Sequence, residues 1–237
     1  MNISMMIYYN DDYELDAKKC LDQLYKITLS IESLYGMDKI WYEKGTSRKQ
    51  ALKDIVFSRK HAVEETICRW NKRCRKNYPL FSEGIWDGGN DNNSCSVNYM
   101  KINYQYPQET NLEINMHSSS DEFHIDKVIR FMIEIVSVKK DAFAFIHSNG
   151  YWFLNRNVFL DRLCVGWMIY IPSVVLPELI PEAAKIVPII EGGTQRGTII
   201  VSTEDIFDGA KKEHIEKANN IEIKLLQLGY LPLLREL

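Results

Sequence analysis

The sequence lacks the features that mark membrane-spanning, secreted and fibrous proteins. Its 237 residues include only 12 Gly and 7 Pro, too few for a low-complexity or fibrous chain. The most apolar stretch, residues 165–181, is interrupted by Pro172, Pro177 and Glu178, so we expect no membrane span. No base precedes the short apolar run near the first residue, so we expect no secretory signal. With 46% hydrophobic and 26% charged residues, the composition predicts an ordinary globular protein.

The sequence also lacks paired cysteines. Its 5 Cys are odd in number and widely scattered, and no two of them form a C-x-x-C pair. This usage favours reduced, buried thiols in a cytoplasmic protein over a disulfide framework.

No motif of a known catalytic or nucleotide-binding site is present. The sequence contains no G-x-G-x-x-G, G-x-x-x-x-G-K-[ST], H-E-x-x-H or G-x-S-x-G. His117 and His124 flank Asp121, but a strand end followed by a capped helix start also explains this segment. A metal-dependent nuclease needs a carboxylate cluster with a nearby lysine, and four residues could loosely supply one: Asp87, Asp91, Lys101 and Glu113. Their spacing matches no specific nuclease pattern. We therefore predict no catalytic residue, no metal and no cofactor.

The spacing of apolar residues predicts an α+β fold, a mostly antiparallel β-sheet with several amphipathic helices packed on it. Helices are expected over 14–35, 47–57, 59–76, 121–138 and 211–228. Strands are expected over 2–9, 40–42, 94–104, 111–117, 142–148, 151–155, 166–172, 186–190 and 197–203. We expect a single domain over residues 1–237, in which a helix-rich half, 1–78, and a strand-rich half, 84–237, share one core.

The net charge of −3 is unevenly distributed along the chain. Residues 1–76 have an excess of basic side chains, whereas over residues 83–126 Lys101 is the only base among eight acids. A concentration of acids creates a field that favours a basic partner. This stretch is the candidate partner-binding surface, and its candidate contact residues are Trp86, Asp87, Asp91, Glu109, Glu113, Asp121 and Glu122.

Residues 69–76, RWNKRCRK, form a basic stretch with one aromatic residue. Two interpretations remain open: a nucleic-acid patch, or a solvated helix end whose cations lie near the negative end of the helix dipole. The whole chain is acidic, with a pI near 6.0, whereas a nucleic-acid binder normally presents a dominant positive face. We therefore expect no direct contact with nucleic acid.

The C-terminal half resembles a known family. Segments FAFIHSNGYWF, DRLCVGWMIYIP, GTIIVSTEDIFD and LGYLPLL, all within residues 140–237, resemble the bacterial immunity protein 52 family. The most specific pieces are residues 161–172 and 197–203, and the N-terminal part matches only in layout. The resemblance transfers no catalytic residue, and the matching residues look structural: Gly166, Trp167, Pro172, Gly197 and Asp208.

The resemblance implies a cytoplasmic antidote that binds one cognate toxin tightly and needs no cofactor. Toxins paired with this family resemble restriction-endonuclease-fold nucleases delivered by type VI or related secretion systems. A nuclease cleft holds phosphates and is usually basic, so the acidic stretch would suit it. Alternatives are binding through exposed aromatic residues away from the toxin's active site, a structural or adaptor component of a secretion system, and a metal-dependent hydrolase or nuclease. The sequence allows a homodimer but does not require one.

Overall fold

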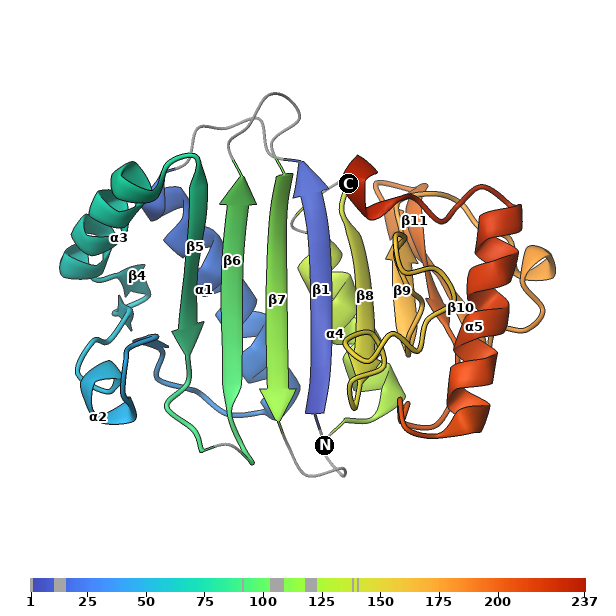
Figure 1. Ribbon diagram of the computed structural model, residues 1–237, viewed down its shortest axis with the longest axis horizontal. Coiled ribbons are helices and arrows are strands. Elements are labelled where there is room, and N and C mark those ends of the chain that lie inside the picture. The colour runs from blue at the N-terminus through green and yellow to red at the C-terminus, as the bar shows by residue number, and fades with distance from the viewer. Residues whose placement is uncertain are drawn as a thin grey trace. The chain divides into compact units, whose positions relative to one another are not determined.

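The computed structural model describes residues 2–10, 16–90, 92–102, 109–117, 123–137, 139 and 141–237. This part of the chain combines five α-helices with antiparallel strands, which confirms the predicted α+β class (Figure 1). It divides into two compact units: unit 1 comprises Met1–Tyr9 and Phe123–Leu237, and unit 2 comprises Asn10–Glu122. These boundaries differ from those of the predicted halves, whose shared core stays a prediction.

Unit 1 is built on five antiparallel strands. Their spatial order is β10 (Lys185–Glu191), β11 (Thr194–Val201), β9 (Met168–Ile171), β8 (Phe143–Ser148) and β1 (Asn2–Asn10). The unit also contains the helices α4 (Ile125–Ser137) and α5 (Lys212–Gln227) and two 3-10 turns, η2 (Pro177–Leu179) and η3 (Leu234–Glu236). Every side chain of β9, and every one of β8 after the first, is buried. Both faces of these central strands are therefore covered.

The strand predicted over 151–155 is wrong, although its composition is that of a strand. The segment forms turns instead, with positive φ at Asn149, Gly150 and Asn155. Trp152 and Phe153 fold back so that their rings contact that of His147 on β8. A local cue, the turn residues Asn149 and Gly150, thus outweighs the β-propensity of the aromatic residues that follow.

A buried carboxylate holds this loop, residues 149–163. Glu222 on α5 is fully buried, and its Oε2 accepts from the backbone N–H of Val158 at 2.9 Å. Its Oε1 accepts from the backbone N–H of Val165 at 3.0 Å and from the Tyr151 hydroxyl at 2.8 Å. Burial raises the pKa of Glu222 even though these three donors oppose the shift. The loop and α5 are therefore joined by one side chain.

Unit 2 contains a second set of antiparallel strands, with a long helix against one face. The strand order is β7 (Glu109–His117), β6 (Cys95–Ile102), β5 (Leu80–Trp86) and β2 (Tyr42–Glu43). Figure 1 shows α1 (Ala17–Tyr35) crossing behind β5, β6 and β7. Its start is capped by Asp16, whose side chain accepts from the Lys18 N–H, and it ends at Gly36 with φ of 68°. The predicted amphipathic helix is thus confirmed, and its buried stripe includes Leu21, Leu24 and Ile31.

The basic segment of unit 2 begins its helix later than predicted. Residues 57–62 form a small hairpin of β3 (Phe57–Ser58) and β4 (His61–Ala62), with positive φ at Arg59 and Lys60. The helix α3 therefore spans Glu64–Asn77 rather than 59–76, and the short helix α2 covers only Arg48–Ala51. The start of α3 is delayed because a turn with positive φ cannot continue a right-handed helix. The short helix α2 ends earlier than predicted, and Ile55 after it bridges to Tyr42 in extended conformation.

An ion-pair cluster fixes α3 to the strands. Glu43 on β2 is buried and accepts from Arg69 Nε and Arg73 Nη2, each at 2.9 Å, while Arg73 also pairs with Glu83 on β5. Burial alone would raise the pKa of Glu43, but the hydrogen bonds from the two guanidinium groups outweigh it and hold that pKa below its ordinary value. One buried carboxylate thus joins β2 to two successive turns of α3.

Replacing Glu222 by Leu is expected to lower the free energy of unfolding by about 2–5 kcal/mol, because the backbone N–H groups of Val158 and Val165 lose their acceptor and the Tyr151 hydroxyl keeps only Asn219 Oδ1. Urea denaturation at neutral pH, followed by tryptophan fluorescence, measures the change. The matched control is Glu216→Leu, an exposed position on the same helix, which should change the free energy by less than about 0.5 kcal/mol. Similar losses in both variants would contradict the role assigned to Glu222.

Replacing Glu43 by Gln is expected to lower the free energy of unfolding at neutral pH by about 1–3 kcal/mol, because charge-assisted hydrogen bonds are lost. The folded pKa of Glu43 lies below its unfolded value of about 4.5, so its stabilisation is present above that pH and is lost as pH falls through the folded pKa. The stability difference between wild type and variant should therefore shrink as the pH falls below about 4.5 and through the folded pKa. Denaturation series at several pH values test this, with Glu64→Gln on the exposed start of α3 as the control. A difference that does not depend on pH would refute the assignment.

Candidate functional site

The predicted partner-binding residues all belong to unit 2. Asp91, Asp121 and Glu122 lie outside the described residues, and only the backbone of Glu109 is described, at the start of β7. The structure therefore locates the side chains of three predicted contact residues, Trp86, Asp87 and Glu113. It does not bring these three together on one surface.

Asp87 lies at the end of β5 and its charge is paired inside unit 2. Its Oδ2 lies 2.6 Å from Lys39 Nζ, and the two side chains are only 2% and 10% exposed. Its Oδ1 accepts from the backbone N–H of Gly89 at 3.0 Å, which shapes the following turn. A carboxylate neutralised and buried in this way contributes little field at the surface.

Glu113 lies on an open face of the unit 2 strands. Along β6, residues Cys95, Val97, Tyr99 and Lys101 are buried, whereas the side chains between them are half-buried. Glu113 on β7 is opposite Asn98 on β6 and belongs to this second, polar face. Figure 1 shows no described helix of unit 2 in front of β6 and β7. The face is therefore available to a partner as far as the described part of unit 2 is concerned.

A chain of polar contacts crosses this open face. Asn98 Nδ2 donates to Glu113 Oε2 at 2.8 Å, and Lys44 Nζ donates to Asn98 Oδ1. Lys44 reaches Asn98 by passing over Gly84, where an added Cβ would lie 2.7 Å from Asn98 Oδ1 and 2.9 Å from Lys44 Cδ. Glycine is thus needed at position 84 for this close approach. The result is a pre-arranged row of an ammonium, an amide and a carboxylate.

Trp86 lies at the end of β5 beside this row. Its ring is half-buried, 6.3 Å from the ring of Tyr42, and the Arg48 guanidinium carbon lies 6.0 Å from its centre. Such an arrangement is a cation–π contact, which orients both side chains. Trp86 and Glu113 therefore lie on the same face of the strands, whereas Asp87 supports the turn that follows β5.

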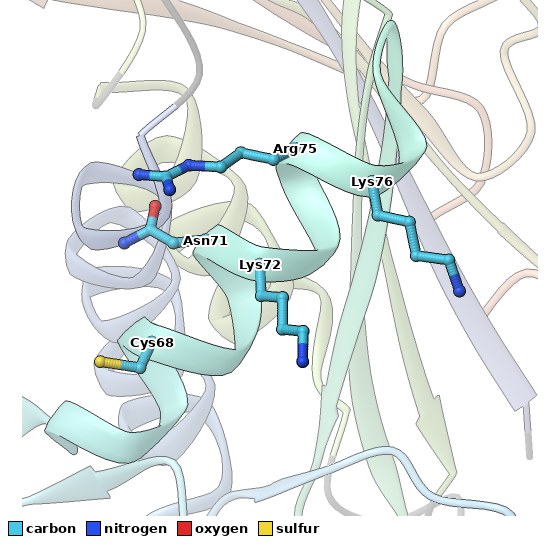
Figure 2. A pocket seen from close by; sticks show the side chains of 5 residues that line it. All are labelled: Cys68, Asn71, Lys72, Arg75 and Lys76. Carbon is cyan, nitrogen blue, oxygen red and sulfur yellow. The ribbon is translucent and has the colours of Figure 1, made fainter.

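The structure shows a basic surface that sequence reasoning interpreted only as a helix end or a nucleic-acid patch. Five side chains of α3 line a shallow pocket on the helix: Cys68, Asn71, Lys72, Arg75 and Lys76 (Figure 2). The three cations are exposed, and no ion pair involves them within the part of the chain that the structure describes. The signal in the sequence is their spacing of three and four residues, which places all five side chains on one helix face.

The prediction that the cysteines are buried is wrong in part. Cys20, Cys95 and Cys164 are buried, as predicted, but Cys68 is exposed and Cys74 is half-buried. Burial raises the pKa of the Cys95 and Cys164 thiols.

Among the residues that the structure describes, no group of three or more His, Cys, Asp and Glu could hold a metal ion. Within the same residues, no helix combines the length and apolar character of a membrane span.

Comparison with solved structures supports the fold. The T6SS protein PA0821 of Pseudomonas aeruginosa matches with a TM-score of 0.54 over 96% of this chain and 76% of its own length. The identity is 7%, so this likeness concerns the fold alone. No curated protein matches the sequence.

The match to a family model covers many more residues than the resemblance seen in the C-terminal half of the sequence. The model described as Immunity protein 52 matches residues 7–234, which include most of unit 1 and all of unit 2. The match covers nearly the whole sequence, including the segments that carry α3 and the open face of β5–β7. The chain therefore belongs to the immunity protein 52 family.

Proposed function

We propose that this protein binds one cognate antibacterial toxin and neutralises it by direct contact. The observation that carries the proposal is the family match over residues 7–234. A protein that acts by occupying a toxin needs a stable scaffold and an exposed surface rather than an active site. Unit 2 offers such a surface in the open face of β5, β6 and β7, held by the row of Lys44, Asn98 and Glu113.

The toxin in this proposal is a nuclease, met in the cytoplasm and delivered by a type VI or related secretion system. The fold likeness to a T6SS protein of Pseudomonas aeruginosa is in keeping with that setting. A nuclease cleft must hold phosphates and is basic, so it would attract Glu113 together with the acids at positions 91, 109, 121 and 122. Trp86 would supply the aromatic anchor that interfaces commonly use.

Co-expression with the toxin-like product of the neighbouring gene is the direct test. We expect survival of cells that otherwise die, and co-purification of the two proteins as a stable complex. Rescue without a complex would favour an enzyme that modifies the toxin or reverses its damage. Co-purification with structural secretion proteins, without rescue, would favour the adaptor alternative. The control is the same toxin expressed with an unrelated immunity protein.

Charge reversal at the open face tests the contact surface. Glu113→Lys should slow association with the toxin by roughly two- to fivefold at low ionic strength, because it removes an attractive charge and adds a repulsive one. Stopped-flow or surface-binding kinetics measure the rate. Glu182→Lys makes the same charge change at an exposed position in unit 1 and serves as the control. Equal rates for the two variants would remove Glu113 from the contact surface.

A further inference from the structure

Helix α3 has an inner face that is fully engaged with the rest of unit 2. Trp70 and Thr66 are completely buried, and Arg69 and Arg73 are held by Glu43. These four residues recur at spacings of three and four, so they occupy one side of the helix. Because both a large ring and two ion pairs are fixed on that side, α3 cannot roll about its axis without breaking them.

The outer face of α3 is consequently presented in a fixed orientation. Cys68, Asn71, Lys72, Arg75 and Lys76 follow the same spacing on the exposed side, and Figure 2 shows their side chains projecting from one helix. We call these five residues the outer stripe. Its cations differ from the other two of the helix, Arg69 and Arg73, which are neutralised by Glu43 and Glu83. The positive charge that remains on α3 is therefore concentrated in Lys72, Arg75 and Lys76.

Helix stability alone does not explain the outer stripe. Arg75 and Lys76 lie in the last turn, where cations interact favourably with the helix dipole. Lys72 lies before that turn, and it repels Lys76 four residues later on the same face. Among the described residues, no ion pair neutralises Lys72, Arg75 or Lys76, so helix stability does not account for the position of all three cations and an external anion could bind them.

The chemistry of the stripe favours a protein partner over a nucleic acid. Proteins that bind single strands stack bases on aromatic rings, but Trp70, the single aromatic residue of α3, is completely buried on the inner face. A duplex binder typically contacts about 6–10 phosphates, whereas this face carries three cations. Three cations on one rigid face match a small group of carboxylates on a folded surface.

We infer that the outer stripe of α3 docks an acidic patch on the cognate toxin and accelerates the encounter. This rests on the proposed function, and it adds a second contact surface whose charge is opposite to that of the acidic segment. A partner with both a basic cleft and an acidic patch would then be oriented as it approaches, because each patch meets its complement.

The test compares two triple variants of the full chain with the same change in net charge. In K72E/R75E/K76E the stripe is reversed, and in K211E/K212E/K217E three exposed lysines at and within α5 of unit 1 are reversed. Association with the purified toxin is measured at about 20 mM and about 200 mM salt, since the Debye length falls from roughly 20 Å to under 10 Å between them. We expect the stripe variant to associate about tenfold or more slowly at low salt, and to lose most of the wild-type salt dependence. The control should stay within about twofold of wild type.

A neutral triple variant and a DNA-binding measurement distinguish the stripe inference from a folding defect and from nucleic-acid binding. The neutral variant K72Q/R75Q/K76Q should show an intermediate rate with wild-type circular dichroism and melting temperature, which excludes a folding defect as the cause. If K72E/R75E/K76E associates with the toxin as fast as K211E/K212E/K217E and wild type while the complex still forms, the stripe inference is overturned and the proposed function stands. If the wild type forms no complex with the toxin, both fail. Binding of a DNA duplex of about 20 base pairs by the wild type, lost in the stripe variant, would overturn the protein-partner assignment.

Discussion

The organisation of unit 2 depends on the burial of Glu43 between two arginines. An ionised carboxylate taken out of water is costly unless it is paired and hydrogen-bonded, so Arg69 and Arg73 have to remain where they are. That requirement sets the rotation of α3 relative to β2 and β5 within the unit. It also decides which side chains of a very polar helix face outward. An internal electrostatic constraint thus determines the external charge pattern.

The same constraint explains why charge counted along the sequence misrepresents the surface. The acidic excess over residues 83–126 includes Glu83 and Asp87, whose partners Arg73 and Lys39 come from the basic part of the chain. Pairing across 48 residues, as between Lys39 and Asp87, leaves no local signature in the sequence. The outer stripe of α3 is exposed and positive, although the net charge of the chain is negative. The sequence gives the net charge of each segment, but it does not show which charges are neutralised by ion pairs with distant residues.

Periodic elements were predictable, and turns with unusual backbone angles were not. The apolar stripe of α1 and the hairpin of β10 and β11 follow from spacing and glycine turns. The segment 151–155 has the composition of a strand, yet Glu222, from a helix over sixty residues later, fixes the loop that contains it. Of the predicted contact residues, Trp86 and Glu113 share a face because strand register aligns them, and Asp87 does not because alternation turns it to the opposite side. Register and long-range partners are the missing information in each case.

The path of the chain through unit 1 has a consequence for how the fold tolerates change. The chain leaves this unit after β1 and returns only at Phe123, yet β1 pairs with β8 in a continuous register from Ile3 opposite Ser148 to Tyr8 opposite Phe143. The entropy of closing so long a loop grows only with the logarithm of its length, and each doubling costs about 0.6 kcal/mol. Insertions and deletions in unit 2 therefore alter the thermodynamic cost of closing unit 1 very little. Pairing of such distant strands nevertheless raises the contact order of the fold, which is the property that slows folding.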